Sequence, residues 1–508
     1  ALVFAFETAG SSLVASASGP DPVACGETKT VTVNFDRNLG TPGLRGYEIT
    51  FEVVGAGVTF DETDIASGGA LPAVGGTYFE AVPVGGNVYT VNEAILGATP
   101  GLLADGALFT VDLATVADGL VEFNILSYKL RDPDNGFMFA DLTGTGFTVD
   151  CTAPDPVTDI TAGPRHNKID VAWTHDGADT AVYEIFRGLW HDGTPGDSAY
   201  PEYDDVNPVT PVRPTDYADA VASAEWVPAG TVAVGTTTFT DEWSDHLSRG
   251  VYYYEVFAID AATNVSPIAT ANDRATNYWL GDVYGPDAVS PDPDGEVISF
   301  DVNRLGAAFA TVSGDPGYDN EVDVGPTDDW SRLGIPTTDD IIDFEDLMVF
   351  SMNFNVVTPA KTEFGVGGAV QLVWRDRGDG TWALELQGGS GLKGLHVTAD
   401  LPVGAVRPGA MLRGQEIFLA NPGGRLDANL ALLGQGRAFE GTGELFVVTT
   451  AVDPRHADID ARGIGNAKLA VDTTGSGSGE TPLAFRLVGN HPNPFNPMTK
   501  IAFTLPAD

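Results

Sequence analysis

Residues 43–53 read "GLRGYEITFEV", and residues 391–401 read "GLKGLHVTADL". The two stretches share Gly, Leu, Gly and Thr in the same register, and farther along "GALFTV" at 106–111 is matched by "GELFVV" at 443–448. Each stretch alternates apolar and polar residues. Because successive side chains of a strand point to opposite faces, this alternation predicts strands with one buried face. We therefore expect two copies of one antiparallel β-sandwich, at 1–152 and at 358–474.

The composition favours a modular, mostly β protein. The chain has 508 residues with 61 glycines and 33 prolines, so it is too long for one ordinary domain and rich in turns. Its net charge of -45 disfavours nucleic acid and anionic membranes as partners, favours cations and keeps an exported protein soluble. Since no run of about 18 apolar residues is present, the sequence predicts no membrane span.

The layout of the two repeats resembles cohesin domains, in which a G-x-x-G-x-x-h-x-h strand precedes a G-x-L-h-x-h strand, where h is apolar. Cys25 and Cys151 flank the first repeat. A disulfide between them would suit an oxidising compartment, and two buried thiols are the alternative. The start "ALVFAFETAG" lacks Met and basic residues, as a chain does after removal of a signal peptide. We expect a secreted protein, extracellular or at the cell surface.

Residues 153–277 resemble a fibronectin type III domain, which implies a third sandwich. The resemblance rests on Trp173 in "KIDVAWT", the alternating strand "GVYYYEVFAID" and the closing "NVSP". A long insert at 189–226 predicts either a functional loop or a packed flap. We expect four of its aromatic residues to be exposed and able to hold polysaccharide: Trp190, Tyr200, Tyr203 and Tyr217.

Acidic residues crowd the stretch at 278–357. Between 281 and 354 there are seventeen Asp and Glu residues and two basic ones, Arg304 and Arg332. Crowded carboxylates repel one another unless a cation such as Ca²⁺, which takes about six to eight oxygen ligands, neutralises them. In the first half we predict the ligands Asp282, Asp292, Asp294, Asp301 and the backbone carbonyl of Glu296, with Gly295 at the sharp turn. In the second half we predict Asp323, Asp339, Asp343 and Asp346, with Asp328 weaker and Asp340 in place of the turn glycine.

An apolar pattern of helical spacing follows each acidic loop, with Val302, Leu305 and Phe309 after the first and Leu347, Phe350 and Phe354 after the second. Two tandem loop–helix units of this kind resemble a dockerin module. The resemblance implies about two Ca²⁺ sites and docking onto cohesins through the helices. The alternative is a solvated acidic linker. The fold class that we expect is therefore mostly β, with tandem antiparallel β-sandwiches and a small α-helical calcium-loop module between them.

The C-terminal stretch at 475–508 contains the linker-like "GSGSGE" and then "PNPFNPMTKIAFTLP" at 492–506. The latter resembles the start of the C-terminal sorting domain of the type IX secretion route. "TKIAFTL" here, and "ALVFAF" at the other end, could add to a neighbour's sheet edge or be edge strands of their own domains.

The sequence predicts no catalytic site. It contains no H-E-x-x-H, no G-x-S-x-G and no phosphate-binding glycine loop, and its seven histidines are scattered; a glycosidase-type carboxylate pair stays open. We expect an extracellular structural protein that forms a filament, tube or surface layer as a head-to-tail homo-oligomer or polymer. The alternatives are a cell-surface scaffold or carbohydrate-binding adhesin, and the non-catalytic portion of a secreted hydrolase.

Overall fold

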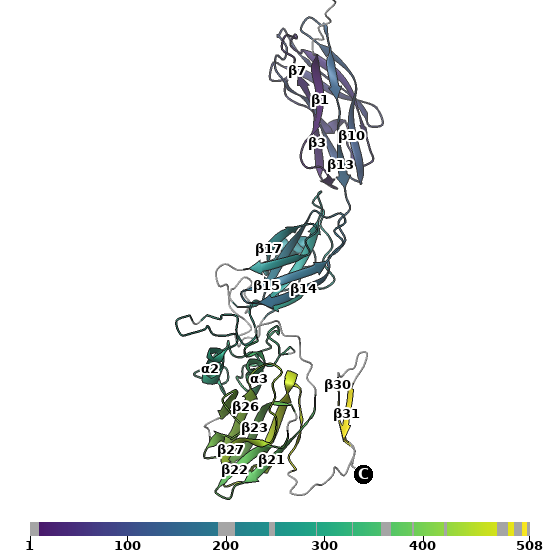
Figure 1. The fold of residues 1–508 in the computed structure, drawn as a ribbon. Helices are drawn as coiled ribbons and strands as arrows, with labels where there is room; N and C mark the ends of the chain where they lie inside the picture. The colour runs from purple at the N-terminus through teal and green to yellow at the C-terminus, as the bar shows by residue number, and fades with distance from the viewer. Residues whose placement is uncertain are drawn as a thin grey trace, which may run out of the picture.

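The computed structural model describes residues 10–190, 209–242, 249–290, 292–327, 329–356, 367–388, 391–420 and 424–474, and the strands at 486–491 and 500–504. Three β-sandwiches and a small loop–helix segment follow one another along this part of the chain (Figure 1). We call them the N-terminal sandwich, the middle sandwich, the loop–helix segment and the C-terminal sandwich. The predicted fold class, mostly β with tandem sandwiches and few helices, is confirmed.

The N-terminal sandwich contains two sheets. One has the spatial order β12 (Ala140–Thr143), β1 (Ser11–Ala17), β3 (Thr28–Asp36), β9 (Gly106–Thr115) and β5 (Val58–Thr59), with β6 (Ile65–Ser67) also on β9. The other has the order β2 (Val23–Ala24), β13 (Thr145–Asp150), β10 (Gly119–Arg131), β4 (Gly46–Val54), β8 (Val88–Ile95) and β7 (Thr77–Gly85), with β11 (Phe137–Met138) on β10. A 3-10 turn, η1, covers Glu62–Asp64.

The alternation along β3 and β4 decides which side chains enter this core. On β4, Ile49, Phe51 and Val53 are buried, and the residues between them are partly exposed. The Phe51 ring stacks on Phe123 with centroids 4.6 Å apart. Cys25 and Cys151 form the expected disulfide, which joins the two ends of the sandwich across 126 residues.

The middle sandwich packs a three-stranded sheet against a four-stranded one. The first is β14 (Thr158–Arg165), β15 (Lys168–Thr174) and β18 (Thr238–Glu242); the second is β17 (Trp226–Ala233), β16 (Val182–Leu189), β19 (Val251–Ile259) and β20 (Asp273–Thr276). Trp173 lies in the core between them.

The described part of the insert is a packed flap. Helix α1 (Tyr217–Ala222) covers Phe186 and Phe257 on the outer side of the four-stranded sheet. The prediction of exposed aromatic residues was wrong for two of them. Trp190 is 8% exposed and donates a hydrogen bond to the Tyr253 hydroxyl, and half-buried Tyr217 donates one to Glu184. Tyr200 and Tyr203 lie outside the described residues.

The C-terminal sandwich has one sheet in the order β24 (Val406–Pro408), β27 (Gly443–Thr449), β22 (Thr381–Leu386), β21 (Ala369–Asp376) and β29 (Ala470–Asp472). The other sheet is β25 (Glu416–Ala420), β26 (Arg425–Leu432), β23 (Leu392–Pro402) and β28 (Asp458–Gly463). The 3-10 turns η3 (Pro454–His456) and η4 (Ile464–Asn466) follow β27 and β28, and β30 (Arg486–His491) pairs with β31 (Lys500–Thr504).

The repeated sequence stretches occupy equivalent places in the two outer sandwiches. The first of each pair forms an interior strand of one sheet, β4 or β23, and the second forms a strand of the opposite sheet, β9 or β27. The two stretches thus share a structural role, because Ile49 and Phe51 on β4, like Leu395 and Val397 on β23, lie in the core of their sandwich.

Candidate metal centre

The loop–helix segment consists of two similar units. The first loop (282–298) leads into α2 (Ser299–Ala308), and the second loop (323–343) leads into α3 (Phe344–Asn353). Near the end of the first loop, Val297 accepts a hydrogen bond from the Asn355 N–H beyond α3, over 2.9 Å. Near the end of the second loop, Ile342 accepts one from the Ala310 N–H beyond α2, also over 2.9 Å. Because each unit completes the backbone hydrogen bonds of the other, the two form one structure.

Asp301 and Asp346 hold the same position in the two units. Each is fully or almost fully buried in the first turn of its helix, and its carboxylate accepts three backbone N–H groups. For Asp301 the donors are Val283, Tyr284 and Ile298, and for Asp346 they are Val324, Gly325 and Asp343, all at 2.7–2.8 Å. These two residues therefore connect the start of each loop to the start of the helix that it precedes.

Asp282 and Asp323 also correspond, and neither is exposed. Asp282 accepts the Gly295 N–H at 2.7 Å, and Asp323 accepts the Asp340 N–H at 2.9 Å. Gly295 has a φ of 92° and Asp340 a φ of 66°, so both take the left-handed conformation that the turn requires. Asp340 therefore keeps the turn despite the cost, about 1–2 kcal/mol, that a side chain carries in this conformation.

One carboxylate oxygen of Asp323 has no hydrogen-bond partner among the described residues. Its Oδ2 accepts the Tyr318 hydroxyl at 2.8 Å as well as the Asp340 N–H, but no described group donates to its buried Oδ1. Burial, opposed by the Tyr318 hydrogen bond and aided by the nearby Asp339, raises the pKa of Asp323 to about 7. A buried carboxylate oxygen without a donor is costly. A cation at this oxygen would remove the cost, so this one oxygen of the predicted set fits a metal ion.

Burial acts in the same direction on the neighbouring acids. It raises the pKa of Asp301 to about 6, raises that of Asp346 well above its usual value, and raises that of Asp339. The loops would therefore take up protons at acid pH when no cation is present. Since all the predicted ligand atoms are oxygens, they suit a hard ion such as Ca²⁺ rather than a metal that prefers nitrogen or sulfur.

The remaining predicted ligands lie nearer the surface. Asp294 accepts the Glu296 N–H at 3.0 Å and Asp339 accepts the Ile341 N–H at 3.2 Å, while Asp343 caps α3 by accepting the Glu345 N–H at 2.8 Å. Asp292 and Glu296 are exposed, and Asp328 lies outside the described residues. In the described part of either loop, no three carboxylates come within 4.8 Å of one another. The ligand set as a whole stays a prediction.

The described carboxylates that do converge within 4.8 Å are Asp150, Asp179 and Asp260. They lie where the N-terminal sandwich meets the middle sandwich, beside Asn264, whose side chain donates to the Asp150 carbonyl and to Asp260 at 2.8 Å. No sequence motif predicts this group, because its members belong to separate strands and turns.

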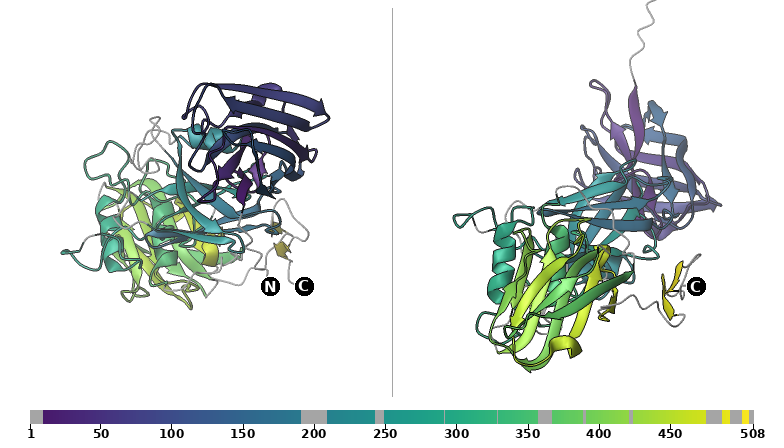
Figure 2. Two further views of the ribbon diagram at one scale, coloured as in Figure 1. Left: turned by 90° about the horizontal axis from the view of Figure 1, so that it is seen from above. Right: turned by 60° about the horizontal axis from the view of Figure 1, so that its bottom comes forward.

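Helix α3 is packed against the C-terminal sandwich of its own chain (Figure 2). Its Phe344 ring lies 5.6 Å from the His396 ring on β23. Gly394 on the same strand leaves room for Met348, because a Cβ on this glycine would lie 2.2 Å from the Met348 Sδ. Beside them, Glu345 pairs with Arg462 of β28 at 3.5 Å. The contact between the helix and the sandwich is therefore made within one chain.

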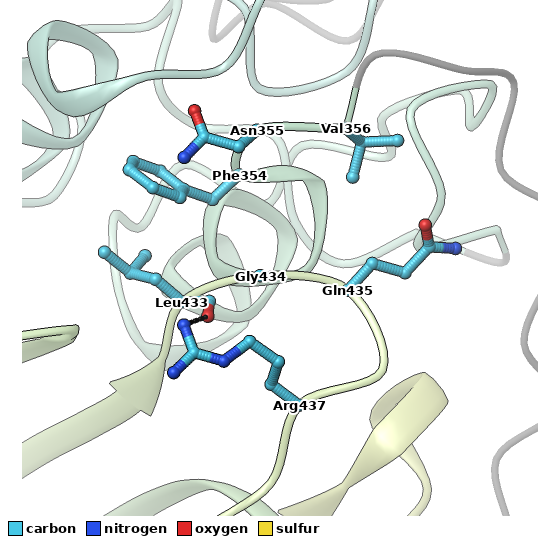
Figure 3. A pocket seen from close by; sticks show the side chains of 7 residues that line it. All are labelled: Phe354, Asn355, Val356, Leu433, Gly434, Gln435 and Arg437. Carbon is cyan, nitrogen blue, oxygen red and sulfur yellow. Dashed lines mark hydrogen bonds between the residues drawn. The ribbon is translucent and has the colours of Figure 1, made fainter.

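A depression of about 340 Å³ lies where the end of α3 meets the loop after β26 (Figure 3). It is lined by Phe354, Asn355, Val356, Leu433, Gly434, Gln435 and Arg437. Arg437, its one charged lining residue, donates to the Leu433 carbonyl at 3.0 Å and to the Gln415 side chain. The lining contains no carboxylate, histidine or hydroxyl group, so it offers no acid–base or nucleophilic pair.

Comparison with solved structures finds cohesin modules at low identity. A non-cellulosomal cohesin from the archaeon Archaeoglobus fulgidus is 16% identical over 28% of this chain and 92% of its own, with a TM-score of 0.23. A cohesin module from a Clostridium perfringens family 33 glycoside hydrolase is 15% identical over 28% and 99%, with a TM-score of 0.24. The type II cohesin dyad of the ScaA scaffoldin of Acetivibrio cellulolyticus is 11% identical over 52% and 98%, with a TM-score of 0.24.

Scans of known protein families and of curated proteins find no match. Structural similarity of this size shows neither a family nor a partner. Among the helices that the structure describes, none is long and apolar enough to cross a membrane.

Proposed function

We propose that this chain is an extracellular structural protein that self-assembles head-to-tail, and that Ca²⁺ in the two loops stiffens the joint between its middle and C-terminal sandwiches. The observation that carries the proposal is the buried Oδ1 of Asp323, which has no hydrogen-bond partner in the described part of the chain, within a loop–helix unit that occurs twice. A carboxylate in this position is favourable only with a proton or a cation beside it.

The contact of α3 with β23 and β26 supports a structural role. Because this helix face is covered by the chain's own C-terminal sandwich, the loop–helix segment acts as a fixed joint. Association between chains would then use surfaces at the two ends of the molecule. Head-to-tail contacts of this kind generate rings or filaments according to the rotation between neighbours.

The Cys25–Cys151 disulfide supports an oxidising, extracellular setting. The net charge of -45 would keep the metal-free chain soluble, and divalent ions would screen it. Secretion by the type IX route rests on the sequence resemblance at 492–506.

A carbohydrate-binding adhesin is the other candidate, and the described part of the insert gives it no support. Trp190 and Tyr217 lie against the middle sandwich, so neither offers an open ring face to a sugar. A cell-surface scaffold without self-association remains compatible with the same joint.

Electron microscopy of the purified full chain in millimolar Ca²⁺ and in EDTA tests the proposal. We expect regular filaments, tubes or sheets with Ca²⁺, and shorter or no polymers in EDTA. Single particles under both conditions would contradict self-assembly. Retention of the chain on polysaccharide without polymers would favour the adhesin.

A further inference from the structure

We infer that the two loops have different tasks: a cation in the first loop fixes the middle sandwich, and a cation in the second loop fixes α3 on the C-terminal sandwich. The inference rests on the proposed function, because it takes both loops as cation sites. It adds that His166, a residue of the middle sandwich, is a positioning residue for the first site.

His166 lies in the turn between β14 and β15 and faces the first loop. Its Nδ1 is 3.6 Å from the Asp282 Oδ2, and this buried nitrogen has no hydrogen-bond partner among the described residues. The ring also covers Gly295, since a Cβ there would lie 3.1 Å from the His166 Cγ. The turn glycine of the loop thus leaves space for a side chain from another domain.

The side-chain amide of Asn167 fixes the orientation of this histidine. It lies 2.8 Å from the His166 Nε2, and when it donates to that nitrogen the imidazole proton is on Nδ1. The N–H then points toward the Asp282 carboxylate. At 3.6 Å this is an electrostatic contact rather than a hydrogen bond, so His166 lies behind a predicted ligand and is not a ligand itself.

Arg249 gives the middle sandwich a second contact with the same residue. Its guanidinium donates to the backbone carbonyl of Asp282 and stacks over the Tyr278 ring at 3.9 Å. Asp282 thus faces His166 on its carboxylate side and accepts a hydrogen bond from Arg249 at its backbone carbonyl. A cation that orders Asp282 would order both contacts.

The end of the second loop and its helix face the C-terminal sandwich, whereas Arg332, earlier in that loop, accepts the Leu280 N–H at its backbone carbonyl over 3.0 Å and stacks over the Trp279 ring beside the first loop. Glu345, directly after the loop, pairs with Arg462, which also pairs with Asp460 at 2.8 Å. Phe344 and Met348 pack on β23. These α3 contacts lie on the C-terminal sandwich, so a cation at the end of the second loop would act first on α3.

Binding and positioning are reciprocal. If a cation in the first loop strengthens the His166 contact, the contact must strengthen cation binding by the same factor. We expect His166→Ala in the full chain to weaken Ca²⁺ binding at one of two sites by about fivefold or more, the lower end for such coupling. The matched control is Arg165→Ala, since exposed Arg165 pairs with Asp170 and not with the loop.

Calorimetric titration with Ca²⁺, combined with hydrogen exchange read by mass spectrometry, tests the inference. Asp282→Asn should remove Ca²⁺-dependent protection from the 163–170 and 249–252 peptides and leave that of α3. Asp323→Asn should do the reverse, and His166→Ala should lose only the 163–170 protection. Equal loss at both places in every variant, or an unchanged affinity in His166→Ala, would overturn the inference. Failure of the parent chain to bind Ca²⁺ would instead overturn the proposed function.

Discussion

Asp323→Asn should change the stability of the loop–helix segment in opposite directions with and without Ca²⁺. The pKa of Asp323 rises from 3.8 to about 7 in the folded chain. At about 1.4 kcal/mol per unit, keeping this carboxylate ionised above pH 7 without a cation costs on the order of 4 kcal/mol. An asparagine carries no charge and keeps an oxygen for the Asp340 N–H and the Tyr318 hydroxyl.

The expected gain in EDTA is smaller than this cost. The ionised carboxylate makes stronger hydrogen bonds than an amide oxygen, a difference of about 1 kcal/mol for each of the two donors. We therefore expect Asp323→Asn to stabilise the chelated segment by about 1–3 kcal/mol at pH 7.5. In Ca²⁺ at about 100 times its dissociation constant, the parent chain gains about 2.7 kcal/mol by linkage, and the variant should lose this gain.

Denaturant unfolding, monitored by hydrogen exchange of the α3 peptide, measures the stability of this segment separately from that of the three sandwiches. The matched control is Asp287→Asn, because exposed Asp287 only accepts the Val289 and Ser290 N–H groups of a turn. That substitution should leave stability unchanged in both buffers. An equal loss of α3 stability in EDTA and in Ca²⁺ on Asp323→Asn substitution would refute the prediction.

The pH, a substitution beneath α3 and removal of the disulfide should each change the stability of one part of the chain. In EDTA the loop–helix segment should lose stability as the pH rises from about 4 to about 7. Asp301 and Asp323 have folded pKa values of about 6 and about 7, so they bind more protons in the folded than in the unfolded chain. Denaturant unfolding at pH 5 and at pH 7.5 checks this sign, and higher stability at pH 7.5 would contradict it. Gly394→Ala should lower the free energy of unfolding by about 1–3 kcal/mol and speed hydrogen exchange in α3, because the new Cβ forces Met348 aside. The control Gly404→Ala should do neither, since no atom lies nearer than 3.6 Å to its new Cβ. Equal effects of the two substitutions would argue against the α3 contact. The double variant Cys25→Ser/Cys151→Ser should destabilise the N-terminal sandwich alone by about 5 kcal/mol. Scanning calorimetry should then show one unfolding transition at a lower temperature, and a shift of every transition would contradict the prediction.

The strand pattern was predictable because it depends on local alternation. The apolar positions of "GLRGYEITFEV" and "GLKGLHVTADL" face a core in both sandwiches, so a reader of the sequence can assign the buried face. The correspondence of Asp301 and Asp346 was predictable in the same way, since each stands at the start of an apolar helical pattern, but their role as acceptors of three backbone N–H groups was not.

Contacts between distant segments could not be predicted. Nothing local to Gly394 indicates that Met348 will lie over it, and nothing in the insert indicates that Trp190 will be covered by Arg274 and Tyr253. The position of His166 on the first loop depends on how two sandwiches meet, which no periodicity encodes.

Calorimetric titration of the full chain with Ca²⁺ at pH 7.5 tests most directly whether cations order the joint. We predict two ions in the loops of the parent chain, one fewer in Asp323→Asn, and two fewer in the double variant Asp282→Asn/Asp323→Asn. A double variant that binds as many ions as the parent would contradict the account.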